Sequence, residues 1–182
     1  HYFCRKLLTK THHSMYETTF RQAAENDIDG IMTIIRQAVS QMLREGKHQW
    51  DDTYPQRCHI ADDIARGCGY VMTCGGRLAA YGAVVFSGEP AYNSIRGQWL
   101  SDGRYVVLHR LAVADGMKGQ GVAARFMAEV EKMAAEKGVH SFKVDTNHDN
   151  TRMQRVLNKL GFTYCGTVSY EKGDRMAYEK ML

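Results

Sequence analysis

The residues best suited to chemistry stand together between Val107 and Met127. Gly116, Gly119 and Gly121 form a short loop there, after an apolar run and before a strongly helical segment. A strand, a glycine loop and a helix start in succession aim backbone N–H groups and the positive end of a helix at one spot. The sequence therefore predicts a binding site for a phosphate or pyrophosphate group.

Two other polar positions could carry proton chemistry close to this loop. His109 lies upstream on the same apolar run, and an imidazole accepts or releases a proton near neutral pH. Alternation along a strand would place His109, Leu111 and Val113 on one face. Asp145 ends a later apolar run, where its carboxylate could orient a substrate or relay a proton. No paired spacing of His, Cys or acidic residues predicts a metal site.

These residues need a scaffold, and the apolar periodicity of the chain predicts one. Helices are expected from Asp27 to Gly46, from Pro55 to about Arg66, from Val122 to Lys137 and from Asn150 to Leu160. Strands are expected at Thr18–Ala23, Tyr70–Thr73, Leu78–Phe86, Tyr105–Val113, His140–Val144, Phe162–Tyr170 and Arg175–Met181. Residues 87–102 are expected to form a loop whose length suggests that it covers a site. The order indicates a mixed α/β domain, a central mixed sheet flanked by helices, with a βαβ unit at its centre.

Size and composition fit one globular domain. The chain has 182 residues, 44% of them hydrophobic and 24% charged. Residues 1–14 are expected to be a disordered or upstream leader, and residues 15–182 the domain. No apolar run is long enough for a membrane span, and three charges of the net +4 lie in the leader, which argues against a nucleic-acid partner. Five cysteines without zinc-like pairing or a signal peptide predict free thiols and a cytoplasmic location.

Two motifs, in the correct order, carry a family resemblance. Residues 116–121 read GMKGQG, and residues 150–162 read NTRMQRVLNKLGF, an Asn-led helix that ends in Gly-Phe. With the element order after Met15, they resemble the GCN5-related N-acetyltransferase (GNAT) family. The glycine signature of that family is Arg or Gln, two residues, Gly, one residue, then Gly or Ala. Gly116 stands where the signature has Arg or Gln.

A Rossmann dinucleotide site is the nearest alternative, with Asp145 at a suitable distance to bind a ribose. Its glycine spacing is GxGxxG, whereas this chain has GxxGxG. The order of strands and helices also does not fit a doubly wound sheet, so the GNAT resemblance is favoured.

The resemblance implies that acetyl-CoA binds as co-substrate. Backbone groups of Leu111, Ala112 and Val113 would then pair with the pantetheine arm. The pyrophosphate would be held by backbone N–H groups of the loop and helix start, namely Lys118, Gly119, Gln120, Gly121, Val122 and Ala123. Asn150 would hydrogen-bond the cofactor arm from the far side. The charge of Lys118 or Arg125 would compensate for Gly116.

An amine must be neutral before it attacks a thioester, and an alkylamine has a pKa near ~10. His109 is the expected base, since HRLAV resembles the HSLAV segment of arylalkylamine N-acetyltransferases, where the His acts as a base through water. Many relatives place a Tyr as general acid seven residues after the helix Asn, but that position is Leu157 here. Either Tyr164 or Tyr170 takes this role, or the thiolate, with a pKa of roughly 8.5, leaves unaided.

The expected reaction moves an acetyl group from acetyl-CoA to a primary amine of a small molecule, peptide or protein, by direct attack in a ternary complex. Family analogy nominates an acceptor pocket of Trp50, Tyr54, Tyr92, Trp99, Asp145 and Tyr170. Aromatic rings there could stack on an apolar or cationic acceptor. A non-catalytic CoA-binding sensor is the alternative, which Gly116 and Leu157 keep open. A homodimer is a possible assembly.

Overall fold

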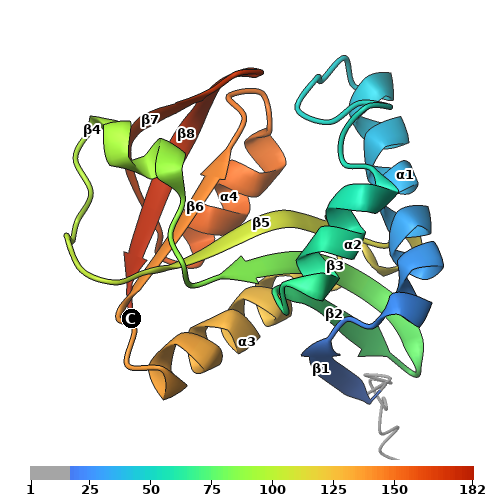
Figure 1. Cartoon of the computed structure of the whole chain (residues 1–182). Helices are drawn as coiled ribbons and strands as arrows, with labels where there is room; N and C mark the ends of the chain where they lie inside the picture. Colours follow the sequence, from blue (N-terminus) through green and yellow to red (C-terminus); the bar gives the residue numbers. More distant parts are fainter. Residues whose placement is uncertain (1–16) are drawn as a thin grey trace, which may run out of the picture.

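A mixed sheet of eight strands forms the centre of the fold in the computed structural model, which describes residues 17–182 (Figure 1). Its spatial order is β1-β2-β3-β5-β6-β8-β7-β4. The strands are β1 (Thr18–Gln22), β2 (Gly69–Cys74), β3 (Arg77–Val85), β4 (Arg96–Gly97), β5 (Val106–Val113), β6 (Ser141–Thr146), β7 (Thr163–Tyr170) and β8 (Gly173–Met181). The α-helices are α1 (Ile28–Arg44), α2 (Arg57–Ala65), α3 (Val122–Glu136) and α4 (Thr151–Lys159). The mixed α/β class is confirmed, while the expected leader of residues 1–14 lies outside the described residues.

The helices cover the two faces of the sheet through separate apolar clusters. α1 and α2 pack on one face, where Ile31, Ile35 and Ile60 are buried. α3 packs on the opposite face, where Phe126 and Val130 are buried. The apolar residues of each helix recur at three- and four-residue spacing, so each helix presents one stripe to the sheet. No helix within residues 17–182 is long and apolar enough to cross a membrane.

Two segments differ from the sequence prediction. The sequence predicts Pro55 inside the first turn of a helix, but α2 starts at Arg57, where the backbone N–H of Gln56 donates to the ring Nδ1 of His59 (2.9 Å). The predicted loop 87–102 contains a 3-10 turn, η2 (Pro90–Ser94), and the short strand β4, which pairs with β7. A Cβ atom on Gly166 would lie 2.3 Å from the carbonyl oxygen of Arg96, so this pairing requires glycine. A two-residue strand has no periodicity that a sequence pattern could reveal.

β5 and β6 are parallel neighbours that soon separate. Their register joins Val106 to Phe142 and Val107 to Lys143 only, at the start of both strands. Beyond these pairs the strands diverge toward their carboxyl ends, as Figure 1 shows. β5 continues to pair with β3, and β6 continues to pair with β8. The sheet therefore stays intact on both sides of a gap.

A β-bulge interrupts β5 at Arg110. Tyr81 of β3 pairs with Ala112 and Ala83 pairs with His109, so Arg110 and the next residue together face a single residue of β3. Arg110 has the left-handed backbone angle φ 54°.

The bulge resets the alternation of side chains along β5. Leu108, Leu111 and Val113 pack with the cluster under α3, whereas His109 turns to the opposite face and meets Glu89. The prediction that His109 shares a face with Leu111 and Val113 is therefore wrong, because strict alternation does not pass through a bulge.

Candidate active site

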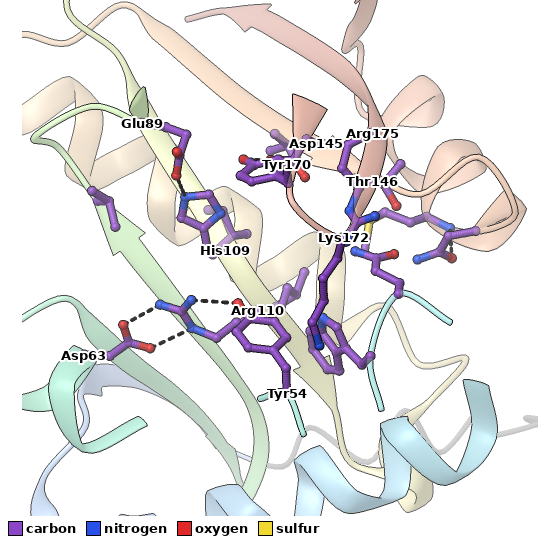
Figure 2. A pocket seen from close by; sticks show the side chains of 18 of the residues that line it. Tyr54, Asp63, Glu89, His109, Arg110, Asp145, Thr146, Tyr170, Lys172 and Arg175 are labelled. Carbon is purple, nitrogen blue, oxygen red and sulfur yellow. Dashed lines mark hydrogen bonds and ion pairs between the residues drawn. The ribbon is translucent and has the colours of Figure 1, made fainter. Parts of the chain in front are cut away.

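Two adjoining cavities open along the gap between β5 and β6. The larger, of about 700 Å³, is lined by His109 and Asp145 and is called the histidine cavity (Figure 2). The smaller, of about 480 Å³, is lined by Gly119 and Gly121 and is called the glycine-loop cavity. The two cavities share the lining residues Met42, Gln49, Trp50, Leu111, Asn150 and Met153. A ligand can therefore extend from one cavity into the other.

The glycine-loop cavity has the features of an anion site. Gly119 and Gly121 have φ angles of 77° and 74°, and a Cβ atom on either would meet no protein atom within 4 Å. The hydrogen bond from Arg125 N–H to Gly121 carbonyl (3.0 Å) opens the ladder of α3. The N–H groups of the first helical turn precede that ladder and have no intrahelical partner. Glycine thus keeps open the space in front of these donors, where a pyrophosphate can bind.

Most of the residues predicted for the cofactor line this cavity. They are Leu111, Ala112, Val113, Lys118, Gly119, Gly121, Val122, Ala123 and Asn150. Gln120 does not line it, because its side-chain amide turns away to donate to the carbonyl of Gly116 (3.0 Å). Asn150 accepts a hydrogen bond from Met153 N–H (3.2 Å) through its side-chain oxygen, which caps α4. Its side-chain nitrogen is left for a ligand.

Helix α1 fastens the glycine loop. The side-chain oxygen of Gln37 accepts from the backbone N–H of Asp115 (2.9 Å). One turn later along α1, the side-chain oxygen of Gln41 accepts from the ammonium of Lys118, which also donates to the carboxylate of Asp115. The ammonium of Lys118 is therefore already bound by Gln41 and Asp115. Other cations that line the cavity are Lys47, Arg152 and Lys159.

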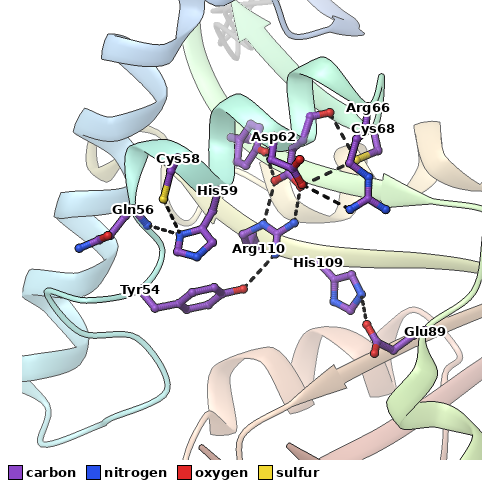
Figure 3. Close-up of polar contacts among 12 residues, drawn as sticks. Tyr54, Gln56, Cys58, His59, Asp62, Arg66, Cys68, Glu89, His109 and Arg110 are labelled. Carbon is purple, nitrogen blue, oxygen red and sulfur yellow. Dashed lines mark hydrogen bonds and ion pairs between the residues drawn. The ribbon is translucent and has the colours of Figure 1, made fainter. Parts of the chain in front are cut away.

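His109 is held by Glu89 in the histidine cavity. Its Nε2 lies 3.0 Å from Oε2 of Glu89, and the side chains are 20% and 19% exposed (Figure 3). The other carboxylate oxygen of Glu89 accepts from Ala91 N–H (3.1 Å). The hydrogen bond from His109 lowers the pKa of Glu89, against the opposing effect of burial. Sequence reasoning missed Glu89, whose one local signal is its place before Pro90 at the start of η2.

Asp145 lies at the end of β6, within hydrogen-bond distance of two tyrosine hydroxyls. Its Oδ2 accepts from the hydroxyls of Tyr92 (2.8 Å) and Tyr170 (2.9 Å). Burial, with the carboxylate of Asp145, raises the pKa of both tyrosines, so they remain protonated donors. One carboxylate oxygen of Asp145 is thus left for other partners.

A buried ion pair anchors the bulge. The guanidinium of Arg110 donates through Nε to Oδ2 of Asp63 (2.9 Å) and through a second nitrogen to the other carboxylate oxygen. Its Nη1 donates to the hydroxyl of Tyr54 (3.0 Å), as Figure 3 shows. The hydroxyl of Tyr81 donates to Asp63. Asp63 is 2% exposed. No local pattern predicts this pair, which joins α2 to β5 across 47 residues.

The predicted acceptor and acid residues divide into two groups. Trp50, Tyr54, Asp145 and Tyr170 line the histidine cavity. Trp99 does not: its Nε1 donates to the carbonyl of Tyr92 (3.0 Å), and the ammonium of Lys143 lies 4.3 Å from the centre of its ring. Tyr164 lines neither cavity, is 50% exposed on β7 and packs its ring against Tyr178. No group of three or more His, Cys, Asp or Glu side chains in the described part of the chain could hold a metal ion.

Comparison with known proteins assigns this arrangement to a family. The model of the acetyltransferase (GNAT) family matches residues 35–162, which include the bulge at Arg110, the glycine loop and helix α4. The chain belongs to the GNAT family. It is an acetyltransferase, and acetyl-CoA is its co-substrate. No curated protein matches the chain.

Solved structures agree with this fold. A GNAT acetyltransferase from Streptococcus agalactiae has 38% sequence identity and a TM-score of 0.83, over 91% of this chain and 95% of that chain. A GNAT acetyltransferase from Listeria monocytogenes has 20% identity and a TM-score of 0.73, over 92% and 96%. A proposed acetyltransferase from Salmonella typhimurium, solved with its cofactor acetyl-CoA, has 19% identity and a TM-score of 0.65, over 91% and 94%.

The α1 contacts predict a role for Gln41 in acetyl-CoA affinity. Gln41→Ala removes the partner of Lys118 and loosens the glycine loop, at a cost of about 1 kcal/mol for one hydrogen bond. The KM for acetyl-CoA should rise about fivefold, with kcat unchanged, in steady-state kinetics. Ser40→Ala, an exposed change on the same helix, is the control and should leave both constants unchanged. An unaltered KM in Gln41→Ala would contradict this role.

Proposed function

We propose that this GNAT acetyltransferase moves the acetyl group of acetyl-CoA to a primary amine, by direct attack in a ternary complex. The observation that carries the proposal is the position of His109. Its imidazole lines the histidine cavity and is fixed by Glu89, next to the gap that leads to the glycine-loop cavity. The two cavities thus join a group that accepts a proton, a pocket for the amine and a site for an anion.

His109 is the proposed base. Its Nε2–H donates to Glu89, which leaves Nδ1 as the nitrogen that accepts a proton. The acceptor ammonium, with a pKa near ~10, would lose its proton to Nδ1 directly or through water. Glu89 stabilises the imidazolium that results, as a carboxylate does for the His of other base–orienter pairs. When bound, acetyl-CoA supplies the thioester, whose carbon–sulfur bond is exchanged for a carbon–nitrogen bond.

No tyrosine acts as a general acid in the proposed reaction. Leu157 is fully buried in the cluster under α3, and Tyr164 lines neither cavity. Tyr170 is bound to Asp145, and burial raises its pKa, which makes it a poor proton donor. A thiolate with a pKa of roughly 8.5 leaves adequately without protonation.

The proposed cofactor contacts follow the cavity. Backbone groups of Leu111, Ala112 and Val113 would pair with the pantetheine arm, because β6 has diverged from them. The N–H groups from Lys118 to Ala123 would hold the pyrophosphate, and the side-chain nitrogen of Asn150 would donate from the opposite wall. A cytoplasmic location and a homodimer stay predictions from the sequence.

The first test is release of the CoA thiol in a screen of amines and peptides, with His109→Ala as the variant. His109→Ala should lower kcat about 10²–10⁴-fold because the proton acceptor is lost. The rise in Tm that acetyl-CoA produces should persist, since the glycine-loop cavity is intact. A Tm rise without thiol release from the unaltered protein would leave only cofactor binding and refute the proposed transfer.

A second variant isolates the role of Glu89 as a positioning residue. Glu89→Gln can still accept from His109 but removes the charge that stabilises the imidazolium. We expect kcat to fall about tenfold at unchanged KM for the amine, since charged hydrogen bonds contribute about 1.5–3 kcal/mol. Glu171→Gln, an exposed carboxylate at the rim without contact to His109, is the matched control. An equal loss of kcat in both variants would mean that the overall charge of the cavity matters, rather than the contact between Glu89 and His109.

A further inference from the structure

The cations of the histidine cavity are paired with one exception. Arg110 binds Asp63, and His109 binds Glu89. Lys172 binds Asp51 (3.3 Å) and the hydroxyl of Thr53 (3.0 Å), which ties the β7–β8 turn to the segment between α1 and α2. Arg66 binds Asp62 (3.3 Å). These contacts leave little free positive charge for recognition of a ligand.

Arg175 is the exception among the cations of this cavity. Its Nη1 donates to the side-chain oxygen of Asn147 (3.3 Å), and its guanidinium lies 6.0 Å from the ring centre of Tyr170. None of the ion pairs within residues 17–182 includes it. A guanidinium has five N–H donors, and one of them is used here. Arg175 is only partly exposed, so its charge is not fully solvated.

The register places Arg175 beside the reaction site. Asp145 of β6 pairs with Ala177 of β8, and Arg175 is two residues away on the same face. Such a diagonal pair is separated by about 7–8 Å. Figure 2 shows Arg175, Asp145 and Tyr170 gathered on one side of the cavity, with His109 and Glu89 beside them. The free oxygen of Asp145 and the free donors of Arg175 thus offer an anionic and a cationic subsite.

We propose that the acceptor is an amine that also carries a nearby carboxylate, of the α-amino-acid type, and that Arg175 binds this carboxylate. The inference rests on the proposed function and narrows its acceptor. The ammonium would lie between Asp145 and His109, and the planar guanidinium suits a carboxylate in a two-point contact. The aromatic walls Trp50 and Tyr54 then face the side chain of the acceptor. A second cation on the acceptor would meet the unpaired charge of Arg175 and be disfavoured.

Matched acceptor pairs test this inference. Each amino acid is compared with its decarboxylated amine: phenylalanine with phenethylamine, methionine with 3-(methylthio)propylamine, and arginine with agmatine. For at least one pair, kcat/KM of the acid should exceed that of the amine tenfold or more. In Arg175→Gln the acid should lose at least tenfold while the amine is unchanged. With CoA bound, that acid should raise the Tm of the unaltered protein but not of Arg175→Gln.

The outcomes separate the two proposals. Arg77→Gln, which removes an exposed cation at the start of β3, should behave as the unaltered protein. Thiol release with amines in preference to the acids in every pair, or an equal loss of both in Arg175→Gln, would overturn the inference and leave the proposed function standing. Absence of thiol release with every acceptor would overturn the proposed function and the inference together.

Discussion

The separation of β5 from β6 is the constraint on which the rest of the structure depends. Two adjacent strands normally satisfy each other's backbone groups, yet here the pairing ends after Val107 and Lys143. The edge of β5 from Leu111 to Val113 is left facing a cavity rather than a strand. Backbone groups that are removed from water need partners, so such an edge invites an extended ligand with amide groups. The remaining pairs, from β1 to β5 and from β6 to β4, hold the two halves of the sheet around this gap.

Because of the bulge at Arg110, the single strand β5 presents side chains to both cavities. Leu111 and Val113 after the bulge pack in the cluster under α3 and line the glycine-loop cavity, while His109 before it lines the histidine cavity. A left-handed residue other than glycine is strained, and the ion pair with Asp63 supplies the compensating contact. Loss of one partner from a buried pair costs about 3–5 kcal/mol, because the other charge is left unpaired. Asp63 therefore maintains the geometry of the bulge, and through Arg110 it also supports Tyr54 in the wall of the histidine cavity.

The sequence was informative wherever local pattern decides structure. Helices α1, α3 and α4 and the glycine loop follow from periodicity and spacing, and these elements lie where they were expected. It was uninformative where distant residues meet. Glu89 reaches His109 across 20 positions from a segment without periodicity, and β4 pairs through two close glycines. The bulge was also hidden, since nothing local distinguishes Arg110 from a regular strand residue. For a related reason the sequence could not show that Trp99 and Tyr164 line neither cavity, because aromatic type does not reveal which face or which end of the sheet a ring will occupy.

The groups that the fold leaves unsatisfied lie on the walls of the two cavities. Elsewhere in the described residues, the buried polar side chains have partners: Glu179, which is fully buried, accepts from Leu100, Ser101 and Ser141. By contrast, the first N–H groups of α3 and most donors of Arg175 have none in the described chain. A folded protein bears such costs where a ligand repays them. Both sets donate hydrogen bonds, so the proposed partners are acceptors: a pyrophosphate and a carboxylate. This polarity, rather than any single residue, supports the proposal of an anionic donor molecule and of an acceptor that is itself partly anionic.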